Sequence, residues 1–254
     1  MIDIHAHILP DMDDGARSWE EAAEMAETAA ESGTHTLAAT VHANLPGMDN
    51  HGRLELYARK LERFQRLLRQ EQIPLTVCSG MEVFADASFP KDFCPGDFLT
   101  LNGSPYLLVE FSMDESAAQI YRVLDGLLER GCLPVIAHPE RYECVQAVPA
   151  HVYEWYQMGA VIQLNKGSLL GRFGSRIRRT AESLLRHRLV MAVASDAHRA
   201  DIRTTDLSGA AEILREEYGR ETAYLLLEEN PGRILQGRAL VRQEAVPYDY
   251  AQSF

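Results

Sequence analysis

The chain has 254 residues, of which 46% are apolar, and a formal net charge of −12. This is enough for one large core, and α/β barrels reach this size as a single domain. The acidic charge argues against nucleic-acid binding, which needs clustered Lys and Arg. No stretch approaches the ~18 uninterrupted apolar residues of a membrane span, and the four cysteines are scattered. We therefore expect a cytoplasmic protein without a signal peptide or a membrane-inserted segment.

Short apolar or β-branched runs alternate with stretches of helical period along the chain. Strands are expected at 2–7, 35–42, 75–84, 106–111, 133–138, 160–165 and 189–195. Helices are expected from the capping box of Ser18 and Glu21 to Gly33, and at 51–70, 116–130, 149–158, 175–187, 206–218 and 220–228. Strands joined by helical crossovers predict a parallel sheet.

The best architecture is a closed or distorted (β/α) barrel, with an open doubly wound sheet as the alternative. The strands lack polar alternation, as expected when both faces are covered. We expect a single barrel domain over 1–240. The residues at 241–254 lack periodicity and are expected to form a loosely held tail.

Six of the seven predicted strands end in His, Asp or Glu, at the end of the sheet where barrel enzymes place their chemistry. His5 and His7 lie on one face of the first strand, since side chains alternate. Glu82 and Glu110 follow apolar strand residues, where an unpaired carboxylate would be costly. The candidate metal ligands are His5, His7, Asp14, His42, Glu82, Glu110, His138, Asp196 and His198. A catalytic zinc needs about three protein ligands, so this larger set predicts more than one ion.

The motifs around these residues resemble the polymerase and histidinol phosphatase (PHP) superfamily. Within it, the chain resembles the manganese-dependent tyrosine phosphatases of Gram-positive capsule and exopolysaccharide operons. The most specific segments are His138-Pro-Glu-Arg141 and Ser195-Asp-Ala-His198. Further matches are Met1-Ile-Asp-Ile-His-Ala-His-Ile-Leu-Pro10, Met12-Asp-Asp-Gly15, Val109-Glu-Phe111, Gly167-Ser-Leu169 and Glu229-Asn-Pro231. Relatives often carry His-His where this chain has His42-Ala43, which retains the ligand His42.

The resemblance implies a distorted (β/α)7 TIM-like barrel of the PHP fold, with three Mn²⁺ ions or, alternatively, Fe or Zn. It assigns the first ion to His5, His7, Glu82 and Asp196. Glu82 would bridge to the second ion, held with Glu110 and His138, and the third would take Asp14, His42 and His198. The residues expected to act in catalysis are Arg141, Arg203, Asp14 and His198, with the two arginines on the phosphate.

The implied activity is that of a phosphotyrosine-protein phosphatase, acting on the Tyr-rich tail of a polysaccharide-biosynthesis tyrosine kinase. A small-metabolite phosphatase of the histidinol-phosphatase type stays open. So do an amidohydrolase-type barrel, which commonly uses a carboxylated lysine, and a scaffold. Lys166 is the only lysine near a strand end, and no Cys-x5-Arg segment of thiol phosphatases occurs. An arginine run could recruit an acidic tail or simply face solvent: Arg172, Arg176, Arg178, Arg179, Arg186 and Arg188.

Overall fold

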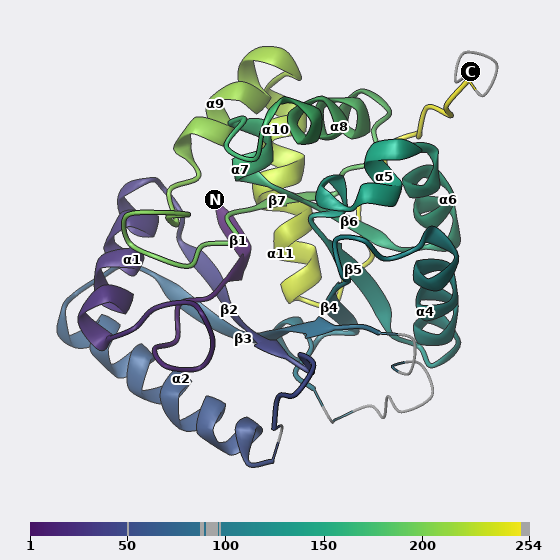
Figure 1. Cartoon of the computed structure of the whole chain (residues 1–254). Coiled ribbons are helices and arrows are strands. Elements are labelled where there is room, and N and C mark those ends of the chain that lie inside the picture. Colours follow the sequence, from purple (N-terminus) through teal and green to yellow (C-terminus); the bar gives the residue numbers. More distant parts are fainter. Residues whose placement is uncertain (50, 87–88, 90–95, 97, 250–254) are drawn as a thin grey trace.

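A computed structural model describes residues 1–49, 51–86, 89, 96 and 98–249. Within this part of the chain, seven strands form one parallel sheet in sequence order (Figure 1). They are β1 (Ile2–Ala6), β2 (Thr36–Ala43), β3 (Thr76–Phe84), β4 (Tyr106–Glu110), β5 (Leu133–Ala137), β6 (Val161–Asn165) and β7 (Ala192–Ala194). Each predicted range overlaps its strand, and only β7 is markedly shorter than predicted.

The sheet closes on itself between β1 and the residues that follow β7. Ala6 pairs in parallel with Ala197. The His7 amide donates to the Ala197 carbonyl at 2.8 Å, and the Asp196 amide donates to the His5 carbonyl at 2.9 Å. We call this contact the β1–β7 seam. The fold is therefore the distorted (β/α)7 barrel that was predicted, and the open doubly wound alternative is wrong.

Both faces of the sheet are covered, which explains why its strands lack polar alternation. Every residue of β1, β4 and β6 is buried. The polar side chains inside these strands include His5, Glu110 and Gln163. Buried polar groups need partners, so these residues mark the end of the barrel where a site is built.

Long helices surround the sheet at the predicted places. They are α1 (Trp19–Glu31), α2 (Arg53–Gln70), α4 (Ala117–Glu129), α6 (Ala150–Met158), α8 (Ser175–Arg186) and α9 (Ser208–Glu217). The capping box at α1 is formed with one difference. Ser18 Oγ accepts from the Glu21 amide at 3.2 Å, but the Glu21 carboxylate accepts from the amide of Arg17, not of Ser18, at 2.8 Å.

Short helical turns that the sequence did not predict also lie between the strands. They are η1 (Leu101–Gly103), η2 (Pro139–Arg141), α5 (Glu143–Ala147) and α7 (Lys166–Leu169). η2 carries Arg141 directly after β5. At the start of α7, the Asn165 side chain accepts from the Gly167 amide at 2.7 Å. η2, α5 and α7 keep the chain close to the carboxyl ends of β5 and β6 instead of leading it straight into the next long helix, whereas η1 directly precedes the amino end of β4.

The last predicted helix, at 220–228, continues further than expected. α10 (Arg220–Tyr224) leads through a π-helical turn, η3 (Leu225–Glu229), into α11 (Asn230–Leu235). Pro231 is tolerated because it lies in the first turn of α11, where an amide donor is not needed. α11 packs against β1, and Gly232 lies close to Ile2 at the start of that strand. In Figure 1, α11 is seen across the centre of the ring of strands.

The residues after α11 contact α8 and the turn that follows it. The Val246 amide donates to the His187 carbonyl at 3.0 Å, and His187 Nδ1 donates to the Val246 carbonyl at 2.8 Å. The Tyr248 ring stacks on the His187 ring with centroids 3.6 Å apart. The domain boundary near residue 240 stays a prediction, and the end of the predicted tail at 250–254 lies outside the described residues. No helix in the described part of the chain has the length and apolar character to cross a membrane.

Candidate metal centre

All nine predicted ligands meet at the carboxyl end of the barrel. Their ligand atoms form three overlapping groups, in each of which the atoms lie within 4.8 Å of one another. The groups are His7, Asp14, His42 and His198; His5, Glu82, His138 and Asp196; and His42, Glu82 and Glu110. Most of these side chains are buried, whereas Asp14 is exposed at the mouth. Whether each residue binds a metal stays a prediction.

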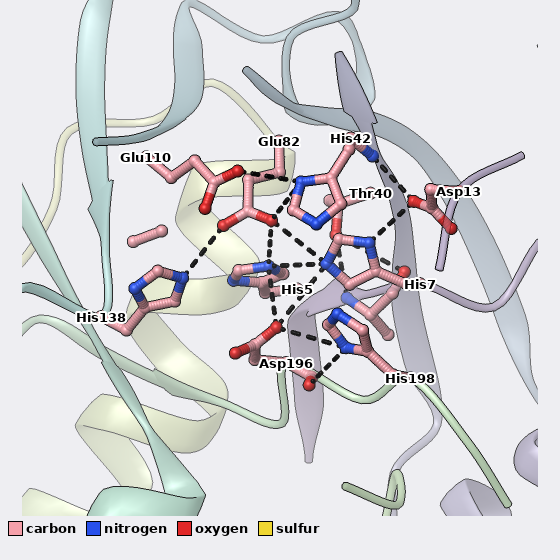
Figure 2. A network of polar contacts seen from close by, with 12 residues as sticks. His5, His7, Asp13, Thr40, His42, Glu82, Glu110, His138, Asp196 and His198 are labelled. Carbon is pink, nitrogen blue, oxygen red and sulfur yellow. Dashed lines mark hydrogen bonds and ion pairs between the residues drawn. The ribbon is translucent and has the colours of Figure 1, made fainter. Parts of the chain in front are cut away.

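Glu82 lies at the centre of the cluster (Figure 2). Its Oε2 atom is 3.1 Å from His5 Nε2, 3.1 Å from His7 Nε2 and 3.2 Å from His42 Nδ1. Its other oxygen, Oε1, is 3.1 Å from His138 Nε2. Since the two oxygens face different imidazoles, Glu82 has the geometry of a bridging ligand.

The three groups differ in part from the ligand sets that the resemblance implied. His7 joins the group at the mouth with His42 and His198, whereas it was expected with His5. His138 joins the buried group with His5, whereas it was expected with Glu110. The nitrogens His5 Nε2 and His7 Nε2 are only 3.2 Å apart. The ligand group at the mouth and the buried ligand group therefore adjoin each other.

The electrostatics of the buried groups fit a cation. Burial opposes a proton on His5, but the carboxylates of Glu82 and Asp196 outweigh it and raise the pKa of His5. Burial would raise the pKa of Glu82, but the facing His5 and other imidazoles hold it well below its usual range. Glu82 Oε2 is buried without a hydrogen bond among the described residues. A metal ion would satisfy this oxygen and the imidazole nitrogens together, and nitrogen and oxygen donors without thiolate suit Mn, Fe or Zn.

His198 is already in the form that binds a metal. Burial and the neighbouring His7 lower the pKa of His198 to about 3. It is therefore a neutral imidazole at neutral pH. Its Nε2 atom lies 3.5 Å from Asp14 Oδ1, which is also 3.5 Å from His42 Nε2.

Two residues that the sequence did not place among the site residues orient the imidazoles. Asp13 Oδ2 accepts from His7 Nδ1 at 2.8 Å and from the His42 amide at 2.8 Å. Gln163 Oε1 lies 2.9 Å from His5 Nδ1. With the Nδ1 protons held in this way, the Nε2 atoms of His5 and His7 are left free to bind a metal. In the sequence, only its place in the pair of carboxylates before Gly15 indicated that Asp13 could belong to the site.

The backbone around the site is folded tightly. Ala16 donates to the His7 carbonyl at 3.1 Å, so the loop that carries Asp13 and Asp14 returns onto the end of β1. A Cβ at Gly15 would lie 2.1 Å from the His7 carbonyl oxygen, and only glycine fits there. His138 and Asp196 have left-handed backbones, with φ of 37° and 49°. Such strain in non-glycine residues is concentrated at functional sites.

Both predicted arginines reach the cluster through Asp196. Arg203 Nη2 donates to Asp196 Oδ2 at 2.6 Å, and Arg141 Nη1 lies 3.4 Å from the same oxygen. Asn165 Nδ2 also donates to it, at 2.6 Å. Arg141 is therefore directed at the site, while the neighbouring Glu140 accepts from Ser168 and from the Asn165 amide.

Lys166 does not belong to the cluster. Its Nζ atom donates to the Thr204 carbonyl at 2.5 Å and to the Asp206 carbonyl at 2.6 Å. Burial lowers its pKa to about 8, although Asp3 opposes this effect. The carboxylated lysine of an amidohydrolase-type centre has no counterpart among the described residues, which disfavours that alternative.

The four remaining histidines stay apart from the three ligand groups. The His35 ring contacts Glu228 at 2.7 Å, and the His187 ring stacks on Tyr248. His151 lies beside Trp155, and His51 begins the turn before α2.

A seven-stranded parallel barrel with histidines and carboxylates at the carboxyl ends of its strands has the architecture of the barrel metalloenzymes. The chain belongs to the capsular polysaccharide synthesis family CpsB/CapC, which matches residues 1–236. The predicted resemblance to capsule-operon phosphatases is thereby confirmed.

Named relatives and a solved structure agree with this family. The chain is 35% identical over 247 residues to tyrosine-protein phosphatase YwqE of Bacillus subtilis (strain 168), covering 97% of this chain and 96% of that protein. It is 31% identical over 245 residues to tyrosine-protein phosphatase CpsB of Streptococcus pneumoniae, covering 94% and 100%. A solved chain from work on YwqE and CpsB, called unique metal-dependent tyrosine phosphatases, matches with a TM-score of 0.90 and 34% identity, covering 98% of this chain and 100% of that chain.

Proposed function

We propose that this protein is a metal-dependent phosphotyrosine phosphatase. The observation that carries the proposal is the cluster of nine candidate ligands at one end of the barrel, with Arg203 and Arg141 directed at its edge. Relatives that align over nearly the whole chain are named tyrosine-protein phosphatases. The metal would be Mn²⁺, with three ions as the expected number and Fe or Zn as alternatives.

The chain's own residues have separate tasks in this reaction. Bound ions would supply Lewis acidity toward the phosphoryl oxygens and lower the pKa of a water. Arg203 and Arg141 would hold the phosphate, because a guanidinium matches its oxygens in a bidentate way. Asp14 and His198 line the mouth, where the ester oxygen would lie. Asp13 and Gln163 keep the imidazoles in the binding tautomer.

A tyrosyl ester suits a site of this kind. The phenol that leaves has a pKa near ~10, so it needs little acid assistance. A cysteine nucleophile is not needed, and burial raises the pKa of the described thiols of Cys78, Cys132 and Cys144. The family description in capsular polysaccharide synthesis supports the phosphorylated Tyr-rich tail of a polysaccharide-biosynthesis kinase as the substrate.

The test compares two substrates on purified protein with Mn²⁺. A phosphotyrosyl peptide should be hydrolysed with a much higher kcat/KM than histidinol phosphate, and a chelator should abolish both activities. Equal, weak rates on the two substrates would refute the protein substrate in favour of a small metabolite. Activity that persists in the chelator would refute the metal centre itself.

A further inference from the structure

An arginine-rich surface lies next to the candidate metal centre. Residues 172–188 contain six arginines and a single acidic residue, Glu182, in a chain whose net charge is −12. Glu182 pairs with Arg178 at 2.8 Å and lies 3.9 Å from Arg186. The four other arginines of this segment are exposed and have no ion pair in the described part of the chain; Arg188 lies beyond the end of α8, whereas three lie before α8 or in its first half. We call these three the arginine strip: Arg172, Arg176 and Arg179.

The strip begins at the wall of the site. Phe173 lies between Arg172 and Arg176 in the sequence, and its ring is 4.8 Å from the guanidinium carbon of Arg141. α8, which carries Arg176 and Arg179, also packs against η2, which carries Arg141. Because Arg176 is three residues beyond Phe173, their Cα atoms are at most about 11 Å apart. An extended peptide rises about 3.3 Å per residue, so a few residues beyond a bound phosphotyrosine cover this distance.

We propose that the arginine strip binds acidic or additionally phosphorylated residues that flank the phosphotyrosine in the same substrate chain. This inference rests on the proposed function and adds to it how the residues that flank the phosphotyrosine are recognised. The three guanidinium groups make no ion pair among the described residues, although Asp206 attracts Arg172 at longer range, so they can make charge-assisted bonds with carboxylates or phosphates. A peptide is favoured over an anionic membrane or nucleic acid because the strip is small and the rest of the chain is strongly acidic.

The experiment uses a double variant of the strip and a matched control. R176Q/R179Q removes two positive charges from α8 and leaves Arg172, next to Phe173, in place. R59Q/R69Q removes two exposed arginines from α2 and changes the net charge equally. The substrates are two phosphotyrosyl peptides of equal length, one with three Asp residues on each side and one with three Asn residues. p-Nitrophenyl phosphate, which is too short to reach the strip, reports on the metal centre.

The wild-type protein should hydrolyse the Asp peptide with a kcat/KM roughly tenfold above that of the Asn peptide, and added salt should reduce the difference. R176Q/R179Q should lose most of this preference through a higher KM, with kcat and the rate on p-nitrophenyl phosphate unchanged. R59Q/R69Q should keep the preference. Equal kinetics on both peptides in the wild type, or an equal loss in R59Q/R69Q, would overturn the inference.

Two further measurements separate the strip from its alternatives. In co-sedimentation with phosphatidylglycerol vesicles, a loss of binding in R176Q/R179Q with unchanged peptide kinetics would assign the strip to a membrane and overturn the proposal. The second measurement is the binding of the two peptides to chelator-treated protein by fluorescence anisotropy. For this purpose each peptide carries a non-hydrolysable phosphonate at the tyrosine. If no substrate is hydrolysed but the Asp preference in binding depends on the strip, the proposed function fails and the docking surface stands.

Discussion

Replacing Asp13 by Asn is expected to weaken metal binding while changing the shape of the side chain very little. Asp13 accepts three hydrogen bonds, from His7 Nδ1, the His42 amide and the Gly15 amide. Asn has only one accepting oxygen, and its NH2 group replaces the other. In at least one of the three contacts, two hydrogen-bond donors would therefore face each other. Either the loop around Gly15 shifts, or His7 takes the tautomer with its proton on Nε2, the atom that faces Glu82.

The size of this effect follows from the role of Asp13 behind a ligand. Loss of such a partner typically costs about 10–100-fold in metal affinity or activity. That corresponds to roughly 1.4–2.7 kcal/mol of binding free energy. The Asp13 side chain is 2% exposed, so solvent cannot replace the missing acceptor.

The assay is a Mn²⁺ titration of chelator-treated protein, followed by hydrolysis of p-nitrophenyl phosphate and by the rise in melting temperature. D11N is the matched control because Asp11 lies in the same loop and is 73% exposed. D13N should need about 10–100-fold more Mn²⁺ for half-maximal activity, whereas D11N should match the wild type. Identical Mn²⁺ dependence in D13N and D11N would show that the hydrogen bond to His7 does not position a ligand.

Three further predictions concern single residues in the site or near it. R203K should lower kcat/KM on a phosphotyrosyl peptide by roughly tenfold or more, because lysine cannot replace the guanidinium fork on Asp196 and phosphate; unchanged steady-state kinetics would contradict this role. G15A should destabilise the protein by about 1–3 kcal/mol or prevent folding, because its Cβ would clash with the His7 carbonyl; a wild-type denaturation curve would refute the close approach. The pKa of Lys166 is about 8 in the folded protein against 10.5 for the unperturbed group, so between these values the unfolded chain binds a proton that the folded protein lacks. Wild-type stability should therefore rise with pH relative to K166M in that window, by up to about 1.4 kcal/mol per pH unit, and parallel urea-denaturation curves from pH 8 upward would disprove it.

The strands and the convergence of the principal candidate ligands could be predicted because both depend on local sequence. Each strand is an apolar run, and Glu82, Glu110 and His138 stand at or directly after such runs. In a parallel barrel every strand ends on the same side, so these side chains had to converge whatever the details of packing. The sequence left two architectures open, a closed barrel and an open doubly wound sheet. The choice between them depends on the pairing of Ala6 with Ala197, two residues that are far apart in the sequence.

The residues behind the ligands were out of reach because their roles depend on long-range contacts. His5 and Gln163 are 158 residues apart, and nothing near either one in the sequence indicates the other. Asp13 and Asp14 are adjacent and chemically identical, yet one holds an imidazole from behind and the other faces the mouth. Only the return of the loop at Gly15 distinguishes them. The end of the last helix was predicted too early because Pro231 occupies a first turn, where proline is tolerated.

The β1–β7 seam has a consequence for the order in which the protein can fold. The segments that close the ring, His5–His7 and Asp196–His198, are the same segments that supply four of the candidate ligands. They are separated by nearly the whole barrel sequence, so the seam is among the most costly contacts to form in terms of chain entropy. A partly folded chain that still lacks β7 would contain His5 and His7 without Asp196 or His198. Complete metal binding thus becomes possible only when the first and last strands have met, and the ions would then stabilise that last contact.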